Sequence, residues 1–301
     1  MDVVVFGAGS LGSLLGGLIA REHAVTLVGR DPHVAAVRES GLRVTGAVTA
    51  DVAPAATTDG TDLAADLAVV TVKAFDTADA ARVLATGDVD AVVSLSNGLG
   101  NDETLAGHLD CPVLAGTTTY GAVLDDPGVV RCTGVGEVAL GPREGGESAV
   151  VDRVGTVFEA AGVRTTVAAD MPRRLWAKLA VNAGINGVSA LARVENGAVR
   201  SGDANDVARR AAVETAKVAR ASGVDLPDDV AVERVEAVAE GTAANRSSTL
   251  QDVEAGRRTE VDALHGAVVE RGEELGVETP VNRTLAGLLR TWERERGLRE
   301  E

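Results

Sequence analysis

The chain has 301 residues, which is enough for two domains, and 45% of them are hydrophobic, so a sizeable core is available. The formal net charge of −16 argues against nucleic acid or an anionic membrane as a partner, because both would repel so acidic a surface. Only three of the 29 basic residues are lysines, and the acidic residues are spread along the whole chain, a balance that indicates adaptation to high salt.

No apolar run approaches membrane-spanning length without charges or glycines, and the N-terminus enters a strand pattern at once rather than a signal peptide. Cys111 and Cys132 match no metal-binding or redox spacing, and we expect both in the core. We therefore expect a cytoplasmic protein that binds no metal.

The first residues predict a dinucleotide-binding turn. Residues 2–6 are apolar and rich in β-branched side chains, as in a buried parallel strand, and residues 13–21 have a helical pattern. A G-x-G-x-x-G loop joins the two: Gly7, Ala8, Gly9, Ser10, Leu11 and Gly12. In such a loop the first glycine permits a tight turn, the second lets the backbone approach a pyrophosphate, and the third lets helix and strand pack closely. The pyrophosphate would lie at the helix N-terminus, where free N–H groups favour an anion.

The second predicted strand, residues 24–28, bears on the choice of cofactor. At the end of this strand NAD-binding domains usually place an acidic residue for the ribose 2′-hydroxyl. Here Gly29 is followed by Arg30, and a guanidinium in place of a carboxylate suits a 2′-phosphate, so NADP is favoured. The alternative is that Arg30 is a surface residue paired with the adjacent Asp31.

Two further predicted strands, residues 67–72 and 91–95, end in polar residues. Ligands of open parallel sheets bind beyond the carboxyl ends of the strands, where Lys73 and Asn97 stand. The alternative is ordinary loop chemistry, which suits Asn97 beside a glycine better than it suits a scarce lysine.

The following segments predict the edge of this sheet and a domain boundary. We expect a strand over residues 112–119, a hairpin of residues 129–133 and 135–140 about Gly134, a helix over 148–161 and a strand over 163–167. An antiparallel edge on a parallel sheet is common. The composition changes near Asp170, so we predict a Rossmann-type, doubly wound α/β domain over residues 1–169 and an all-α domain over residues 170–301.

The second domain shows helical patterns and no convincing strand. The patterns cover residues 174–191, 203–222, 229–243, 248–255, 260–275 and 280–295. Proline and aspartate at the starts of several of these segments, and glycine after their ends, support the assignment. The Arg/Glu run of residues 292–301 is expected to be a solvated helix end and tail.

The first of these helices carries the candidate catalytic residues. Lys178, Asn182 and Asn186 are spaced at i, i+4 and i+8, so they share one face of an otherwise apolar helix. One interpretation is a structural lysine paired with a carboxylate, because a buried polar group needs a partner. In a chain that otherwise avoids lysine, we prefer a lysine that gives up its proton, which arginine does not do. We therefore expect a helix that faces the substrate.

Two polar clusters between later helices have similar alternatives. Asn245 and the pair Ser247 and Ser248 either bind a carboxylate or cap the next helix. Thr259 is expected to cap a helix, with Glu260 in its first turn. A surface acid favoured by the helix dipole is the commoner outcome for such a glutamate.

Together these motifs resemble those of the ketopantoate reductases, the 2-dehydropantoate 2-reductases of pantothenate and coenzyme A biosynthesis. The resemblance covers essentially the whole chain. It lies in the glycine loop and in residues 72–74, 96–98, 116–119, 175–182, 196–197, 247–252 and 259–262. The lysine–asparagine helix and the Ser-Ser-x-Leu-Gln-Asp stretch are its specific parts.

The resemblance implies roles for individual residues. Lys178 would be the proton donor, with Glu260 as the second catalytic residue. The substrate would contact Asn97, Lys178, Asn182, Asn186, Asn196, Asn245 and Ser248. The cofactor would be held by the glycine loop, with Arg30 at its 2′-phosphate and, at its nicotinamide end, Lys73, Asn97, Ala122 and Glu260.

We therefore predict an NADPH-dependent reduction of 2-dehydropantoate to pantoate, with the helical domain closing over the substrate. The expected partner is this small molecule, and a homodimer is left open. One alternative is a reductase of another branched 2-oxo acid on the same fold. The other is a non-catalytic NADPH-sensing regulator, which would have no use for a lysine and two asparagines on one helix face.

Overall fold

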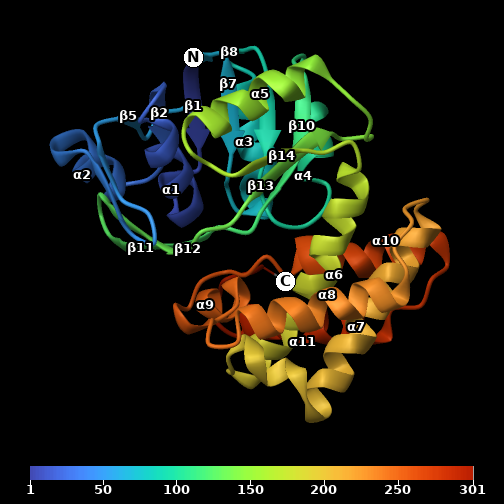
Figure 1. Ribbon diagram of the computed structural model, residues 1–301. Coiled ribbons are helices and arrows are strands. Elements are labelled where there is room, and N and C mark those ends of the chain that lie inside the picture. The colour runs from blue at the N-terminus through green and yellow to red at the C-terminus, as the bar shows by residue number, and fades with distance from the viewer. Residues whose placement is uncertain (301) are drawn as a thin grey trace. The chain divides into compact units, whose positions relative to one another are not determined.

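The computed structural model describes residues 1–300 and confirms the predicted fold class, an α/β part followed by a helical part (Figure 1). Internal contacts divide the chain into two units. The first comprises residues 1–96 and 100–171, and the second comprises residues 97–99 and the chain from Pro172 onward. A boundary between independently folding domains after residue 169 stays a prediction. Among the described residues, no helix is long and apolar enough to cross a membrane.

The first unit is built on one mostly parallel sheet. In spatial order its strands are β14 (Thr165–Val167), β13 (Val138–Pro142), β10 (Val113–Thr118), β9 (Val92–Ser94), β7 (Leu67–Val70), β1 (Asp2–Phe6), β2 (Ala24–Val28) and β5 (Ala55–Thr57). Neighbours from β5 to β10 are parallel, while β13 is antiparallel to β10 and carries β14 at the edge. Because these strands are parallel, the carboxyl ends of β1, β2, β7 and β9 lie at one edge, where open sheets bind ligands.

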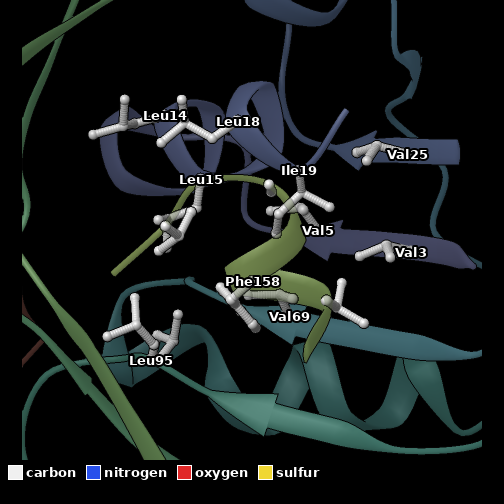
Figure 2. Close-up of a cluster of buried hydrophobic side chains, with 14 of the residues drawn as sticks. Val3, Val5, Leu14, Leu15, Leu18, Ile19, Val25, Val69, Leu95 and Phe158 are labelled. Carbon is white, nitrogen blue, oxygen red and sulfur yellow. The ribbon is translucent and has the colours of Figure 1, made fainter. Parts of the chain in front are cut away.

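Helices cover both faces of this sheet. They are α1 (Ser10–Ile19), α2 (His33–Ser40), α3 (Thr77–Leu84), α4 (Asn101–Ala106) and α5 (Ala149–Ala160), with a 3₁₀ turn at Ala74–Asp76. Successive strand residues point to opposite faces, so Val69 joins the core under α1 and α5 while Val70 joins the core under α3 and α4. Figure 2 shows the first of these cores, where Leu15, Ile19 and Phe158 gather around the strand valines.

A second sheet shows that the predicted hairpin about Gly134 is wrong. In spatial order its strands are β11 (Gly121–Asp126), β12 (Val129–Gly134), β3 (Leu42–Gly46) and β4 (Ala50–Val52), and a short pair β6 (Ala64–Ala65) and β8 (Asp88–Val89) forms a third sheet. β12 pairs with β11 and β3, whereas β13 pairs with β10, so residues 129–142 pass from one sheet to the other. β12 leaves the hairpin because it pairs with β3, which is distant in the chain. The sequence around Gly134 alone does not indicate this pairing.

The described residues of the second unit form helices joined by loops and contain no strand. Its helices are α6 (Met171–Ala192), α7 (Gly202–Ala221), α8 (Asp228–Gly241), α9 (Ser248–Glu254), α10 (Ala267–Leu275) and α11 (Pro280–Arg294), with a 3₁₀ turn at Asn196–Arg200. In Figure 1 they form the yellow-green to red part of the chain. The single helix predicted over residues 260–275 begins instead with a π-helical turn, η3 (Asp262–Gly266), and only then continues as α10.

The π-helical turn packs closely on two neighbours. A β-carbon at Gly187 of α6 would overlap the imidazole of His265, and one at Gly98 would overlap the backbone of Ala263. Gly98 also has φ +90°, which other residues adopt only with strain. Residues 97–99 therefore belong to the helical unit although they follow β9 in the chain. Such π-helical turns frequently occur at functional sites.

A buried polar network holds His265. The two amide hydrogens of Asn282 go to Ala211 O at 3.0 Å and Glu214 Oε2 at 2.9 Å, so its Oδ1 accepts from His265 Nδ1 at 2.9 Å. Glu214 also accepts the N–H groups of Val281 and Asn282 at the start of α11. The imidazole Nε2 is then unprotonated and lies buried beside Gly187 without a polar partner among the described residues. Burial lowers the pKa of His265 to about 4, although the hydrogen bond with Asn282 acts in the opposite direction.

We predict that acid destabilises the protein through His265. Its pKa is lowered from 6.5 to about 4 by folding, so stability present above pH 6.5 is lost as the pH falls toward 4. The loss is roughly 3 kcal/mol at 1.36 kcal/mol per pKa unit. Across this pH range, the melting temperature of the wild type should fall more steeply than that of His265→Gln. The exposed His108→Gln is the control and should follow the wild type; parallel profiles of wild type and His265→Gln would contradict the prediction.

Candidate active site

The glycine loop between β1 and α1 has open space at one of its three glycines. Gly7 has φ +108°, and a β-carbon there would lie 2.7 Å from the nitrogen of Val72. At Gly12 a β-carbon would overlap Gly7 O and the Thr71 hydroxyl, whereas at Gly9 the nearest atom would be Gly7 O at 4.0 Å. α1 begins at Ser10, directly after Gly9. Gly9 is the N-cap of this helix and has no side chain to accept hydrogen bonds from the first N–H groups. The loop therefore offers the space and the donors that a pyrophosphate requires.

The other loop residues fix α1 in the first unit. Ala8 is buried in the main core, and Leu11 packs against that core. The Ser10 hydroxyl accepts the N–H of Leu124 at 3.0 Å, which joins the start of α1 to β11, the strand that contains Ala122. The half-buried Lys73 lies beyond β7, at the N-cap of the 3₁₀ turn.

Arg30 lies beyond the carboxyl end of β2 and pairs with an acid from another strand end. Its side chain is 87% exposed, and Nη2 lies 3.1 Å from Oδ2 of Asp76. Asp31, the alternative partner, instead accepts the N–H of Ala35 at 3.2 Å. The pairing with Asp76 was not predicted, since it joins the loops after β2 and β7, which are distant in the chain.

In the helical unit, α6 presents a polar face. The helix is continuous over Met171–Ala192, so Lys178, Asn182 and Asn186 lie on successive turns and span about 12 Å at 1.5 Å per residue. Trp176, Leu179 and Ile185 around them are buried. Asn186 is buried, and Lys178 and Asn182 are half-buried.

Glu260 is the electrostatic partner of Lys178. Burial lowers the pKa of Lys178 to about 8, while the Glu260 carboxylate raises it. Glu260 is only 5% exposed, so the alternative of a surface acid is wrong. Its Oε2 accepts a hydrogen bond from Asn97 Nδ2 at 3.0 Å. A lysine that is charged at neutral pH and has a pKa near 8 is suited to act as a general acid.

The other end of the polar face meets the start of α9. Asn186 Nδ2 lies 3.4 Å from Ser248 Oγ. Ser247 is the helix cap, because its Oγ accepts the N–H of Leu250 at 3.1 Å, and it also bonds Ser189 Oγ at 2.7 Å. The exposed Ser248 hydroxyl is therefore not used as the cap. Ser189 was missed by the sequence reasoning, although it lies one turn beyond Asn186 on the same helix.

Asn196 and Asn245 are joined to each other. The N–H of Asn196 bonds Asn245 O at 2.9 Å, and its Nδ2 donates to Thr242 Oγ1 at 3.0 Å. The buried Oδ1 of Asn196 has no partner among the residues described, and the Asn245 side chain is exposed. Asn196 thus fixes the loop that presents Asn245.

The helical unit can therefore perform proton transfer on a small polar molecule. An oxygen atom placed near Lys178 would meet a charged ammonium that can stabilise developing negative charge and donate a proton. The amides and hydroxyl of Asn182, Asn186 and Ser248 can bind further polar groups of the same molecule.

Comparisons with known proteins agree over the whole chain. Residues 3–145 match the family "Ketopantoate reductase PanE/ApbA", and residues 170–293 match "Ketopantoate reductase PanE/ApbA C terminal". The 2-dehydropantoate 2-reductase of Halobacterium salinarum is 48% identical over 98% of this chain and 100% of its own. That of Archaeoglobus fulgidus is 43% identical over 96% of each chain.

Solved structures share the fold. A PanE/ApbA family ketopantoate reductase from Ralstonia eutropha JMP134 has a TM-score of 0.91 at 35% identity, covering 99% of this chain and 100% of that chain. D-mandelate dehydrogenase in complex with NADH and anilino(oxo)acetate has a TM-score of 0.92 with the same coverage. Its identity is 23%, so this likeness shows the fold alone.

We predict different effects for two alanine substitutions in the glycine loop. Gly12→Ala puts a methyl group onto the Gly7 carbonyl and should cost about 1–3 kcal/mol of stability, as overpacking does. Gly9→Ala has room for its methyl group, so the melting temperature should hold while dinucleotide affinity falls. Thermal melting and calorimetric titration with NADPH measure the two effects. Unchanged dinucleotide affinity in Gly9→Ala would contradict the placement of the pyrophosphate.

Proposed function

The chain belongs to the ketopantoate reductase family, and from this premise we propose that it reduces 2-dehydropantoate to pantoate with a nicotinamide dinucleotide. Relatives named 2-dehydropantoate 2-reductase are 34–48% identical over nearly the whole chain. The structural observation that carries the proposal is Lys178 on the polar face of α6, with the buried Glu260 as its electrostatic partner. The product would enter pantothenate and coenzyme A biosynthesis.

Lys178 supplies the proton in the proposed reaction. A bound nicotinamide provides the hydride for the ketone carbon. The Lys178 ammonium stabilises the negative charge that develops on the ketone oxygen and donates its proton there, which leaves a neutral amine and an alcohol. The charge of Glu260 raises the pKa of Lys178 and so favours the ammonium at neutral pH, while Asn97 donates a hydrogen bond to the Glu260 carboxylate.

The remaining polar groups orient the substrate. Ser248 and Asn245 bind the substrate carboxylate, and Asn182 and Asn186 contact the groups between it and the ketone. The hydrogen bond between Asn186 and Ser248 supports this arrangement, because it places an α6 amide beside the start of α9. Asn196 contributes by fixing the loop of Asn245.

The proposed cofactor is NADPH. The space at Gly9 accommodates the pyrophosphate, Lys73 and Ala122 lie at the nicotinamide end, and Arg30 binds the 2′-phosphate. Asp76 bears on this assignment, because a bound phosphate must share the Arg30 guanidinium with the Asp76 carboxylate. The same carboxylate would repel the phosphate, so its charge tunes the preference between NADPH and NADH.

One experiment tests the reaction and its substrate. NADPH oxidation is followed by absorbance in molar potassium chloride with 2-dehydropantoate and a panel of other branched 2-oxo acids. The salt matches the acidic composition and the 48% identical relative from Halobacterium salinarum. Preferred turnover of 2-dehydropantoate is expected. Faster turnover of another oxo acid would assign that substrate instead, and cofactor binding without turnover of any of them would indicate a regulator.

We predict that Lys178 is the general acid. Lys178→Met should reduce turnover by roughly 10²–10⁴ while NADPH affinity is kept, since the glycine loop binds the cofactor. In the wild type, turnover should fall as the pH rises through about 8, where Lys178 loses its proton. Glu260→Gln removes the charge that raises this pKa, so its alkaline limb should move to lower pH. Near-full turnover in Lys178→Arg would contradict this role, because it would show that Lys178 supplies only a positive charge and not the proton.

We predict opposite cofactor preferences for the two members of the Arg30–Asp76 pair. Arg30→Ala should weaken NADPH binding by roughly tenfold, about the 1.4 kcal/mol of one charged contact, and leave NADH nearly unaffected. Asp76→Asn should favour NADPH, because the guanidinium is released and a negative charge is removed. The dissociation constants of both cofactors are measured by titration. Equal losses for NADPH and NADH in Arg30→Ala would exclude the phosphate role.

A further inference from the structure

The residues on either side of Glu260 make buried contacts with other parts of the helical unit. We call the two acids in these contacts, Glu293 and Asp262, the anchors. On the N-terminal side, the backbone N–H and the hydroxyl of Thr259 both donate to Glu293 Oε1, at 2.8 and 2.6 Å. The Thr259 hydroxyl also accepts the N–H of Val261 at 3.3 Å, as the predicted helix cap would, so the same residue caps the following turn and is tied to α11. Glu293 is 0% exposed, so this is a buried carboxylate whose first oxygen is fully used by one residue.

On the C-terminal side, Asp262 is surrounded by arginines. Its Oδ1 accepts from Arg290 Nε of α11 at 2.9 Å, and its Oδ2 accepts from Arg299 and lies 3.6 Å from Arg258 Nη2. Burial would raise the pKa of the Asp262 carboxyl, but the hydrogen bonds from Arg299 and Arg290 and their charges bring it below its ordinary value. Asp262 is the first residue of the π-helical turn, so these bonds fix where that turn begins.

Arg299 joins the two anchors. Its Nε donates to Glu293 Oε2 at 2.9 Å while its Nη2 donates to Asp262. The Arg299 side chain is 19% exposed, so the chain after α11 folds back onto the unit up to this residue. The run predicted to be a solvated tail is thus in part a buried ionic contact, and residue 301 lies outside the described residues. An arginine is suited to this position because its planar guanidinium presents several donors at fixed angles.

We propose that Arg299 is a positioning residue for Glu260: by bridging Glu293 and Asp262 it fixes the segment Thr259–Asp262 and thereby the place of the Glu260 carboxylate, the electrostatic partner of Lys178. The proposal rests on the proposed function, because it assigns Glu260 and Lys178 their roles in proton transfer. Arg299 touches neither residue and acts through the backbone between its two partners.

The consequence for Lys178 follows from electrostatics. The attraction between Lys178 and Glu260 weakens as their separation grows or fluctuates. Glu260 is the charged group that raises the pKa of Lys178, and His265 of the adjoining π-helical turn is neutral at working pH because burial lowers its pKa to about 4. Loosening the segment should therefore lower the pKa of Lys178 toward the value that burial alone would give.

The test compares Arg299→Met with Arg296→Met as a matched control. Arg296 lies three residues earlier on the same segment and is exposed, and its guanidinium stacks on Trp292 at 4.6 Å. Its backbone N–H bonds Glu293 O, which the substitution keeps, and its side chain forms no ion pair with Glu293 or Asp262. In Arg299→Met the alkaline limb of turnover should move to lower pH by roughly 0.5–1 unit, and turnover at pH 8 should fall about two- to sixfold. The Michaelis constant for NADPH should hold, and Arg296→Met should match the wild type in every respect.

A second readout needs no turnover. The chain contains three lysines, Lys73, Lys178 and Lys217, so ¹³C labelling of lysine gives three ε-carbon signals that can be titrated separately by NMR. The signal lost in Lys178→Met identifies Lys178, and Arg299→Met should lower its titration midpoint alone. If Arg299→Met melts below the assay temperature, Arg299→Gln, which keeps a donor but not the charge, is measured and should shift in the same direction.

The outcomes separate the two proposals. A folded Arg299 variant with unchanged Lys178 midpoint and unchanged alkaline limb overturns the positioning role. A wild type that turns over no oxo acid overturns the proposed function, whereas the NMR titration still reports whether Arg299 fixes the place of the Glu260 carboxylate. Equal shifts in Arg296→Met and Arg299→Met would attribute the effect to loss of any arginine from the segment and would also overturn the inference.

Discussion

One constraint on the helical unit is that the Lys178 ammonium, which lies on the otherwise apolar helix α6, must stay charged at neutral pH. Burial and Glu260 together leave the pKa of Lys178 at about 8 instead of 10.5, a shift that corresponds to roughly 3 kcal/mol against the charged form. The surrounding structure limits that cost by bringing a single buried carboxylate close. The π-helical turn follows this carboxylate in the chain, and the contacts of α11 and of Arg299 are made to the residues on either side of it.

Much of this could be predicted from the sequence where the signal is local. The short apolar runs rich in β-branched residues predicted the buried parallel strands β1, β2 and β7. The i, i+4, i+8 spacing predicted the polar face of α6, because that period follows from helix geometry. Errors occurred where a distant partner decides. β12 pairs with the distant β3 and β13 with β10, and Arg299 of the expected solvated tail bonds Glu293 and Asp262.

Charge has two different uses in this chain. Most ion pairs join exposed arginines to exposed acids, and such pairs contribute little to stability, about 0–1 kcal/mol each. The pairs at Arg30 and Arg299 differ from these by their position, one beyond the end of a Rossmann strand and the other around a buried carboxylate. In an acidic protein with few lysines, the places where a cation is retained are therefore informative about function.

The position of residues 97–99 limits how segments of related chains can be recombined. They are encoded within the nucleotide-binding half, yet they belong to the helical unit, where Gly98 fits against Ala263 and Asn97 bonds Glu260. A chimaera assembled at a single crossover near residue 170 would join this tripeptide from one parent to the helices of another. Homologous exchange between relatives should therefore succeed only when the tripeptide and the π-helical turn come from the same ancestor, so the two halves are expected to be inherited together.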